Sequence, residues 1–505
     1  MRLRLFAAVL LLAAWGATMC PAAPAAQPGE GPAPAQRQWW AGRLMLPGPR
    51  GPIAVGFVVC LGAAGEGEAG ESWAASFDLV PGPGSLGMSA VECREVTFTP
   101  TELTFTVPPP VATTFRLRRA APDAPVASGE AVIENLGAMA ASASLVTEAE
   151  AMSRVIPRPQ TPRPPLPYER EEVSVASSAD GLTIAGELTI PRAPGPHAAV
   201  ILISDGGVQD RDHHEAHHRP FLVLADHLTR RGIAVLRMDD RGIGGSQGVF
   251  NDATLDTFAA DVRSAAAMLA ARDDIDPDRI ALLGLGDGAA VAALAAAAGD
   301  GPSPRAIVLL SPPGVTGKQN MILRERRRMA AEGEDPAYIE AQASRIEAML
   351  DLVTKGTSQE TIAEAIRDLV LESARANRGT APPPEDWQLR EAAAQQAFIY
   401  TSPATLRWLT LDPADLLRGV RSPVLVLAGD LDLTVPAADN FPKVVAALKE
   451  SGVPVTAERL PGLNHYLQPA TTGFSDEVVS IQTTIHPGAL ERIGAWLEAQ
   501  LAPGR

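Results

Sequence analysis

The sequence predicts an α/β protein: a doubly wound, mainly parallel sheet with a helical cap insertion, preceded by a small all-β domain. The length of 505 residues indicates more than one domain. Short β runs separated by glycine and proline clusters occur before residue 150, whereas continuous apolar runs alternate with helical segments after residue 173. A content of 46% hydrophobic and 20% charged residues suits a chain that buries a large core.

The N-terminus has the pattern of a signal peptide, which we place at residues 1–26. Arg2 and Arg4 precede an apolar stretch, Leu5–Trp15, that is too short to cross a bilayer comfortably. Ala23-Pro24-Ala25 offers a cleavage site of small residues. We therefore expect an exported protein, periplasmic or extracellular, with no transmembrane segment after the signal peptide.

Residues 39–150 are expected to form the all-β domain, because strand-like runs occur at 53–61, 103–107 and 141–146. Two cysteines, Cys60 and Cys93, lie in this domain, while Cys20 leaves with the signal peptide. In an oxidising compartment the two can form a disulfide, and two buried thiols are the alternative. Both interpretations stay open at this point.

A proline-rich linker is predicted at residues 151–172, since six prolines between Pro157 and Pro167 forbid a helix and favour an extended spacer. The α/β domain follows at residues 173–505. Its first apolar run, at 182–190, alternates like a half-exposed edge strand. Continuous runs typical of buried parallel strands follow at 198–204, 233–238, 280–285, 306–311 and 424–429. Helical segments between them are expected at 220–231, 255–272 and 287–298.

Residues 316–400 interrupt this alternation with a charged, helical insertion. Ligand sites lie beyond the carboxyl ends of parallel strands, so an insertion between two strands can cover the site as a cap. We favour a cap over a passive decoration.

Three motifs follow predicted strand ends in the chain order nucleophile elbow, acid, histidine. "GLGDG" (Gly284–Gly288) is the elbow candidate, with Gly286 at its centre. Asp432 lies in "AGDLDLTVP" and His465 lies in "LPGLNHYLQ". In such a set the histidine takes the nucleophile's proton, and the acid fixes the imidazole tautomer and stabilises its charged form.

The region from about residue 170 to 501 resembles the α/β-hydrolase superfamily. It is most similar to a branch of exported bacterial esterase-like proteins related to dienelactone hydrolases and serine peptidases. The stretches that carry the resemblance are "GVQDRDHHEAHHRPF", "ADHLTRRGIAVLRMDDRGIGGS", "GDLDLTVP" and "LPGLNHYLQ". It implies the α/β-hydrolase fold, carboxylic-ester hydrolysis in an active member, Asp432 as acid and His465 as base. Asp430 is the neighbouring rival of Asp432, but its spacing from Gly429 fits the family pattern less well.

The chain departs from this family at the nucleophile, because the resemblance places Gly286 where the family has serine. Asp287 is the alternative nucleophile, but that register puts Leu285 at a position that needs a small residue. Glycine also relieves backbone strain, which costs a residue with a side chain about 1–3 kcal/mol in such a turn.

The oxyanion loop departs as well. It comprises Asp205, Gly206 and Gly207, with Asp287 after the elbow, where the family commonly has Gly-Ser-Gly-Pro in the loop. The N–H groups of Gly206 or Gly207 can point at an oxyanion. If the Asp205 carboxylate faces the site, it opposes negative charge that develops there. Two departures at one site favour an inactive protein.

No cofactor is expected, because the sequence has no phosphate loop or dinucleotide fingerprint. His213 and His217 are weak metal candidates, since histidines four residues apart on a helix can share a metal, but Pro220 and the many charges favour a loop. The formal net charge of −16 argues against nucleic acid and anionic membranes as partners.

Three functions remain open. The first is a catalytically impaired hydrolase relative that binds an ester-like ligand, peptide or partner in the former acyl pocket. The second is an active ester or peptide hydrolase that uses a water activated by His465 or an unrecognised nucleophile. The third is an envelope interaction protein that acts through its β domain. We favour the first. Esterase activity created by Gly286→Ser would indicate that the remaining machinery is intact and that Asp205 is not a barrier.

Overall fold

The described residues of the computed structural model run from 38 to 503, apart from 47–52, 68–69, 80–87, 108–111, 134–136, 153, 155–157, 163–165, 217, 299–302 and 377–385. The predicted signal peptide at residues 1–26 lies outside them. None of the helices in these ranges is long and apolar enough to cross a membrane.

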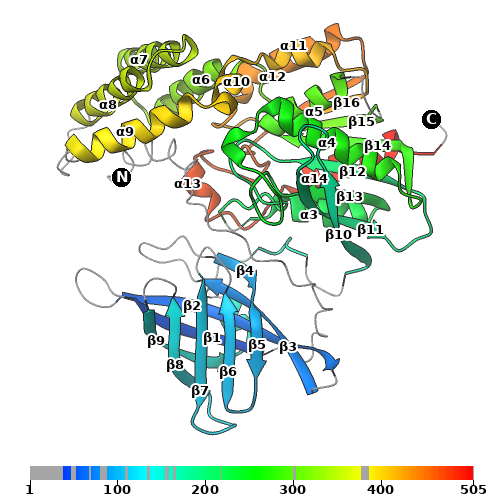
Figure 1. Cartoon of the computed structure of the whole chain (residues 1–505), viewed down its shortest axis with the longest axis vertical. Coiled ribbons are helices and arrows are strands. Elements are labelled where there is room, and N and C mark those ends of the chain that lie inside the picture. The colour runs from blue at the N-terminus through cyan, green and yellow to red at the C-terminus, as the bar shows by residue number, and fades with distance from the viewer. Residues whose placement is uncertain are drawn as a thin grey trace.

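An antiparallel sheet forms the N-terminal part of the structure (Figure 1). Its order is β4-β3-β2-β1-β9-β8-β7-β6-β5, and the sheet curls so that β3 also contacts β5. The inward side chains alternate along each strand and include four packed rings, among which Phe105 and Phe115 stack at 4.7 Å between centroids. The strands are β1 (Gln38–Leu46), β2 (Ile53–Gly67), β3 (Gly70–Leu79), β4 (Met88–Glu92), β5 (Arg94–Phe98), β6 (Glu102–Val107), β7 (Thr113–Arg119), β8 (Val126–Ile133) and β9 (Gly137–Val146). A short helix follows, α2 (Glu148–Met152).

The two cysteines of this sheet lie on opposite faces. Cys93 belongs to the inner core with Phe57 and Phe77, whereas Cys60 packs on the outer face beside Trp39 and Val58. The described structure contains no disulfide between Cys60 and Cys93. The alternation of side chains along a strand therefore decides the question that the sequence left open.

A mixed sheet forms the centre of the second part, in the order β10-β11-β13-β12-β14-β15-β16-β17. The pairs from β13 to β17 are parallel, and the pairs of β11 with β10 and β13 are antiparallel. Its strands are β10 (Tyr168–Ala176), β11 (Thr183–Pro191), β12 (His197–Ile203), β13 (Ile233–Met238), β14 (Ile275–Leu285), β15 (Ala306–Leu310), β16 (Val424–Gly429) and β17 (Val455–Leu460).

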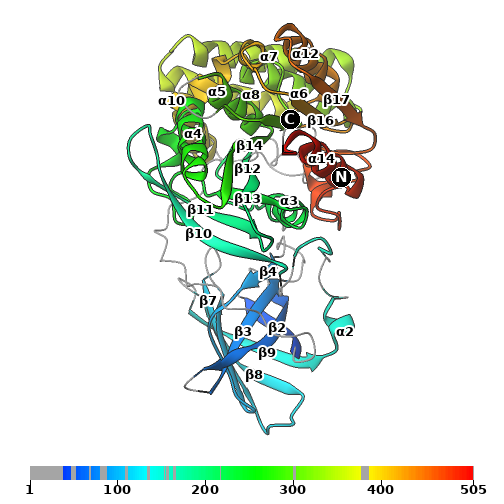
Figure 2. The same ribbon diagram turned by 90° about the vertical axis from the view of Figure 1, so that its right-hand side faces the viewer.

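Helices cover both faces of this sheet, as Figure 2 shows with α4 on one side and α3 and α14 on the other. Alternate residues of β12 enter different cores: Ile201 packs with the face of α4 and α5, and Val200 packs with the face of α3 and α14. This double burial explains why the central strands are continuously apolar. The helices are α3 (Pro220–Thr229), α4 (Leu255–Ala270), α5 (Asp287–Ala297), α12 (Ala437–Glu450) and α14 (Pro487–Gln500), with the shorter η2 (Phe250–Asp252) and α13 (Ser475–Val478).

A helical insertion separates β15 from β16 (Figure 1). Most of it has its own small core, formed by residues such as Leu350, Val353, Ile362 and Tyr400. Its helices are α6 (Gly317–Ala331), α7 (Pro336–Thr354), α8 (Gln359–Ala376), α9 (Asp386–Tyr400), α10 (Pro403–Thr410) and α11 (Pro413–Arg418). The insertion thus extends beyond residue 400, and α10 is the helix that approaches the site described below.

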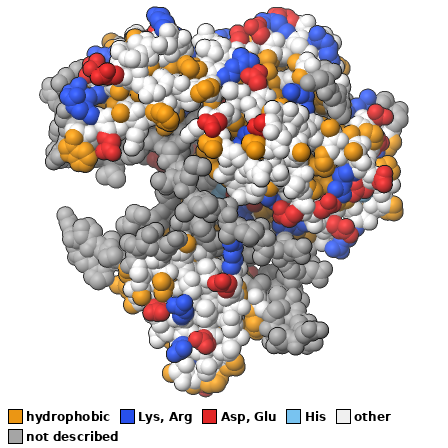
Figure 3. Space-filling view, in the orientation of Figure 1, with side chains coloured by type: hydrophobic (Ala, Val, Ile, Leu, Met, Phe, Trp, Pro, Cys, Tyr) orange, Lys and Arg blue, Asp and Glu red, His pale blue; other side chains and the backbone are white. Residues whose placement is uncertain are grey.

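The prediction of an α/β fold with an N-terminal antiparallel β region is confirmed. The prediction of an edge strand at 182–190 is wrong, because β11 lies between β10 and β13. The edge strand is β10, which begins at Tyr168 within the expected linker. Charges of both signs are interspersed over the face shown in Figure 3, as expected of a solvated surface.

Candidate functional site

The elbow is a tight turn between β14 and α5, and its central residue is Gly286. This residue has φ 53° and ψ −120°, a conformation that strains any residue with a side chain. Gly284 and Gly288 flank it, and a Cβ at either position would overlap backbone oxygens of nearby residues in the same chain. The spacing of the three glycines therefore reflects close packing of strand, turn and helix.

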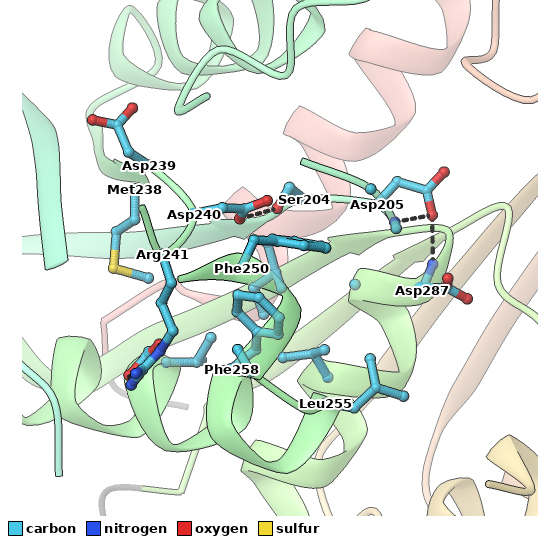
Figure 4. Close-up of a pocket in the computed structure, with 18 of the residues that line it drawn as sticks. Ser204, Asp205, Met238, Asp239, Asp240, Arg241, Phe250, Leu255, Phe258 and Asp287 are labelled. Atoms are coloured by element: carbon cyan, nitrogen blue, oxygen red, sulfur yellow. Dashed lines mark hydrogen bonds and ion pairs between the residues drawn. The ribbon is translucent and has the colours of Figure 1, made fainter. Parts of the chain in front are cut away.

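The Asp205 carboxylate fills the space that a side chain at Gly286 would need. A Cβ built on Gly286 lies 2.7 Å from Asp205 Oδ2, and closer still to Cγ and Oδ1. Asp205 Oδ1 accepts hydrogen bonds from the N–H groups of Gly206 and Asp287, both at 2.7 Å (Figure 4). Gly206 is one of the two residues whose N–H groups were expected to face an oxyanion, and Asp287 belongs to the same expected oxyanion loop. The direction of Asp205, which the sequence left undecided, is into the site.

His465 lies between two carboxylates. Its Nδ1 is 2.8 Å from Asp432 Oδ2, and its Nε2 is 2.8 Å from Asp205 Oδ2. Asp432 is held in turn by the N–H groups of Thr434 and Val435, which donate to Oδ1 at 2.8 Å. Asp205, His465 and Asp432, which we call the Asp–His–Asp chain, are all nearly buried, with side-chain exposures of 14%, 3% and 0%.

The electrostatics of the Asp–His–Asp chain favour a positively charged His465 imidazole. Burial lowers the pKa of His465, but the charges of Asp432 and Asp205 and their hydrogen bonds outweigh burial and raise the pKa well above 6.5. Burial raises the pKa of Asp205, yet the charge and hydrogen bond of His465 outweigh it, and the net pKa is lowered. A carboxylate oxygen only accepts hydrogen bonds, so both ring nitrogens donate. The resting form is an imidazolium between two carboxylates.

The rival acid, Asp430, takes no part in this chain. Its Oδ1 accepts a hydrogen bond of 2.7 Å from the N–H of Gly462, at an exposed turn. Gly207, the third residue of the expected oxyanion loop, is buried and has φ 93°. The structure thus groups Gly286, Asp205, Gly206, Asp287, Asp432 and His465 in one site, with Gly207 adjoining it.

A pocket opens beside the elbow, at the carboxyl ends of β12, β13 and β14 (Figure 4). Asp240 lines it; its Oδ1 accepts from the Ser204 hydroxyl at 2.9 Å, and its Oδ2 accepts from the Gln209 N–H at 2.8 Å. Burial raises the pKa of Asp240 to about 8, against these hydrogen bonds. Burial and the charge of Asp205 raise the pKa of Asp287, a second lining residue, to about 7. The apolar lining residues include Met238, Phe250, Leu255, Phe258, Val291 and Trp408.

Some of these pocket residues were not predicted from the sequence. Asp240 could have been predicted from the sequence, because it closely follows the apolar run of β13, where the carboxyl ends of the parallel strands lie. Trp408 had none, since it reaches the pocket from α10, more than a hundred residues after the elbow.

The metal candidates do not form a metal centre in the described part of the chain. His217 lies outside the described residues, and no cluster of three or more ligating side chains occurs among those that are described. His213 is buried between the rings of Phe221 and Tyr466, at 5.3 and 5.9 Å between centroids. Burial lowers the pKa of His213 to about 4, so this ring is neutral.

Comparison with protein families gives a match over residues 197–367, to the family described as serine aminopeptidase, S33. Among curated proteins, an uncharacterized protein of Mycobacterium tuberculosis, present in strains CDC 1551 and H37Rv, is 36% identical over 138 residues. The aligned region covers 27% of this chain and 44% of that protein, so the chain spans less than half the length of the curated relatives it matches. The family match lies within the α/β part of the chain.

Solved structures with a similar arrangement include an esterase of Pyrococcus furiosus, with 15% identity and a TM-score of 0.40, covering 66% of this chain and 92% of that one. An α/β-hydrolase of a Penicillium species has 19% identity and a TM-score of 0.40, covering 66% and 99%. The esterase Est1E of Butyrivibrio proteoclasticus, solved with ferulic acid, has 17% identity and a TM-score of 0.37, covering 65% and 99%.

Proposed function

We propose that this chain is a non-catalytic relative of the α/β-hydrolases that binds a small ligand in the pocket beside the elbow. The observation that carries the proposal is the position of the Asp205 carboxylate, which occupies the space of a side chain at Gly286. The sequence departure at Gly286 and the structural departure at Asp205 thus complement each other: glycine leaves the space, and the carboxylate fills it.

Three consequences of this arrangement oppose acyl transfer. The elbow presents no nucleophilic side chain at Gly286. The N–H groups that would stabilise an oxyanion already donate to the negative charge of Asp205. The pKa of His465 is raised well above 6.5, so at neutral pH the ring holds the proton that a general base must be free to take. The same argument opposes a hydrolytic water activated by His465.

A second candidate function follows from the same geometry. A carboxylate in the nucleophile's place can itself attack an electrophilic carbon, such as that of an epoxide, and form a covalent ester with the enzyme. The carboxylate O–C bond forms as the ring C–O bond breaks, and the released oxygen takes the proton of the His465 imidazolium. Asp205 Oδ2 is the oxygen that would react, but it is held by His465 at 2.8 Å. Exposure to a small epoxide, followed by peptide mass spectrometry, tests this: an adduct on Asp205 in the wild type, absent from Asp205→Asn, supports the second candidate over the first.

The test of the first candidate is p-nitrophenyl acetate hydrolysis by purified wild type, Gly286→Ser, Asp205→Gly and the double variant Asp205→Gly/Gly286→Ser. We expect wild type and both single variants to match His465→Ala, because Gly286→Ser leaves the serine no room beside Asp205. We expect turnover only in the double variant, which has a nucleophile, free oxyanion donors and a histidine relieved of one carboxylate.

Wild-type turnover that disappears in His465→Ala contradicts the proposal. Turnover by Gly286→Ser alone contradicts the argument that Asp205 blocks the site, even if the wild type is inactive. A matched control is Asp430→Asn in the double-variant background, because Asp430 neighbours the acid but contacts only the turn at Gly462. It should leave any restored activity unchanged.

We further propose that the protein acts outside the cytoplasm, on the basis of the signal-peptide pattern in residues 1–26. Expression of the full chain in a bacterium, followed by fractionation and N-terminal sequencing, should give a mature protein that begins near Ala26. A full-length product confined to the cytoplasm contradicts this.

A further inference from the structure

The pocket beside the elbow has two chemically different walls. Five aspartates and three aromatic rings line it, and two of the aspartates, Asp239 and Asp261, are paired with arginines. The other three carboxyl groups form what we call the acidic wall, and the rings form the aromatic wall. The acidic wall consists of Asp205, Asp240 and Asp287. The aromatic wall consists of Phe250, Phe258 and Trp408. Figure 4 shows Asp205 and Asp287 at one end of the pocket, with Asp240 closer to the two phenylalanine rings.

Of the described residues that line the pocket, Arg241 is the only lysine or arginine. Arg241 lines it, but its guanidinium donates to Asp261, Asp180 and Ser177 at 2.6–3.3 Å, and Figure 4 shows it directed away from the acidic wall. His465 is already held between two carboxylates. Once Asp240 and Asp287 are ionised, a carboxylate or phosphate ligand would therefore meet net repulsion in this pocket.

The aromatic wall suits an apolar body with a positive charge at its end. Phe250 and Phe258 pack with their centroids 5.6 Å apart, and the side chain of Trp408 acts to lower the pKa of Asp287. Ring faces attract an ammonium group, and an apolar body placed against them leaves water. Carboxyl groups at one end of such a wall supply the charged hydrogen-bond acceptors that an ammonium needs.

We infer that this pocket binds a hydrophobic amine, whose ammonium group lies against the acidic wall and whose apolar body lies against the aromatic wall. The inference rests on the proposed function, because it assigns a ligand class to the same pocket. It also differs from the ester-like ligand that the family resemblance implies.

The protonation of the acidic wall makes this binding depend on pH. Asp240 faces Asp239 and Asp210, and its pKa is raised to about 8, primarily by burial. Asp287 faces three charged groups, and burial first and then the charge of Asp205 raise its pKa to about 7. Those three groups are Asp205, His465 and Arg324. Both carboxyls are thus largely protonated in the empty pocket below these values, and an ammonium binds their ionised form. Affinity for an amine should therefore rise with pH, with release of a proton.

The experiment is calorimetric titration of the full mature chain with 2-phenylethylamine, 2-phenylethanol and 3-phenylpropanoate, at about pH 6 and about pH 8.5. We expect the amine to bind most tightly and the carboxylate least. The amine affinity should rise by up to about tenfold for each pH unit below the carboxyl pKa values, since one proton is released per ionised group. Proton release is read from the heats in two buffers of different ionisation enthalpy.

Two variants locate the ammonium, and one controls for charge. Asp240→Asn and Asp287→Asn should each lower amine affinity about tenfold and leave 2-phenylethanol within about twofold, because only the charged contact is removed. Asp278→Asn removes an exposed carboxylate outside the pocket and should change neither affinity.

Equal binding of amine and alcohol at both pH values overturns the inference, as does amine binding that Asp240→Asn and Asp287→Asn leave intact. If both variants fail to fold, the pH dependence and proton release of the wild type decide alone: affinity that is flat or falls with pH overturns it. Ester turnover by the wild type contradicts the proposed function without touching the amine result, so the two failures are distinguishable.

Discussion

At the residue scale, the site is defined by one exchange between Gly286 and Asp205. A serine at the elbow centre needs space and free oxyanion donors, and the Asp205 carboxylate takes both. The variant that tests whether the remaining machinery is intact is therefore Asp205→Gly/Gly286→Ser rather than Gly286→Ser alone. One loop residue, Asp205, thus occupies the space and the hydrogen-bond donors that a serine at the elbow would need.

The protonation of His465 can be tested directly. Because two carboxylates raise its pKa well above 6.5, NMR of the labelled imidazole in the wild type should show the protonated ring at about pH 6.5, where an unperturbed imidazole is half protonated. Asp205→Asn removes one of the two negative charges and should lower the pKa of His465 toward its ordinary value.

Asp430→Asn is the matched control for this titration, since Asp430 makes its hydrogen bond to Gly462 rather than to His465. It should leave the imidazole signal unchanged. A wild-type His465 that titrates near its ordinary value would show that the Asp–His–Asp chain does not hold the proton.

At the element scale, the shape of the pocket depends on how α10 packs against α6. Gly317, the first residue of α6, lies against the Trp408 ring, and a Cβ at Gly317 would come within 2.6 Å of Cδ2 and 2.7 Å of Cε3 of that ring. Glycine at this position therefore lets the indole reach both the pocket and Asp287. The insertion acts on the site through this contact, whatever the function of its outer helices.

We expect Gly317→Ala to displace Trp408 and to weaken 2-phenylethylamine binding by about three- to tenfold, because part of the aromatic wall is lost. Titration calorimetry measures this loss, and Trp408→Ala should produce a similar one. The control is Ala331→Gly, which alters the other end of the same helix. Gly333→Ala is unsuitable as a control, because Gly333 has a φ of 80° that strains any residue with a side chain. Unchanged affinity in Gly317→Ala would mean that α10 does not shape the ligand site.

At the scale of the whole molecule, the two parts of the chain have separate hydrophobic cores. The linker nevertheless docks on the α/β part: the Arg158 guanidinium donates to the carbonyl oxygens of Ala216, Val479 and Ile481 at 2.8–3.1 Å. Because the two cores are separate, we expect the two parts of the chain to unfold in separate calorimetric transitions, each with its own stability.

The transition of the α/β part should shift to lower temperature as pH rises from about 6 to 9. The pKa of Asp240 is raised to about 8 in the folded chain, so its contribution to stability is complete below its unfolded pKa of about 4 and is lost as pH rises to about 8. The raised pKa of His465 acts in the same direction. The contribution of His465 to stability is complete below about pH 6.5 and is lost as pH rises through the pKa of His465 in the folded chain.

Asp240→Asn should make this pH dependence less steep. The slope of the free energy of unfolding against pH should become smaller by up to about 1.4 kcal/mol per pH unit. Scanning calorimetry at several pH values measures it, with Asp278→Asn as the control that keeps the wild-type slope. A wild-type transition that is independent of pH over this range contradicts the raised pKa of Asp240.

Much of the fold could be predicted because its signals are local. Runs such as 198–204 and 424–429 are apolar without alternation, which a strand needs when helices cover both faces of its sheet. The elbow glycines and the spacing of Asp432 and His465 are also short-range patterns, and the structure places all of them at one edge of the sheet. β11 misled the prediction because its alternating sequence resembles an exposed edge, while β10 covers that edge.

The sequence by itself determined the glycine turn at Gly284–Gly288 and predicted that Asp432 and His465 lie near it, because residue identity and turn chemistry are encoded locally. Only the tertiary structure decided that Asp205 turns into the vacant space, that Asp240 and Trp408 join the pocket, and that Cys60 and Cys93 face apart. The physical reason is that a loop side chain takes its direction from groups brought together by the fold. Here those groups are the N–H of Asp287, 82 residues from Asp205, and the imidazole of His465, 260 residues away.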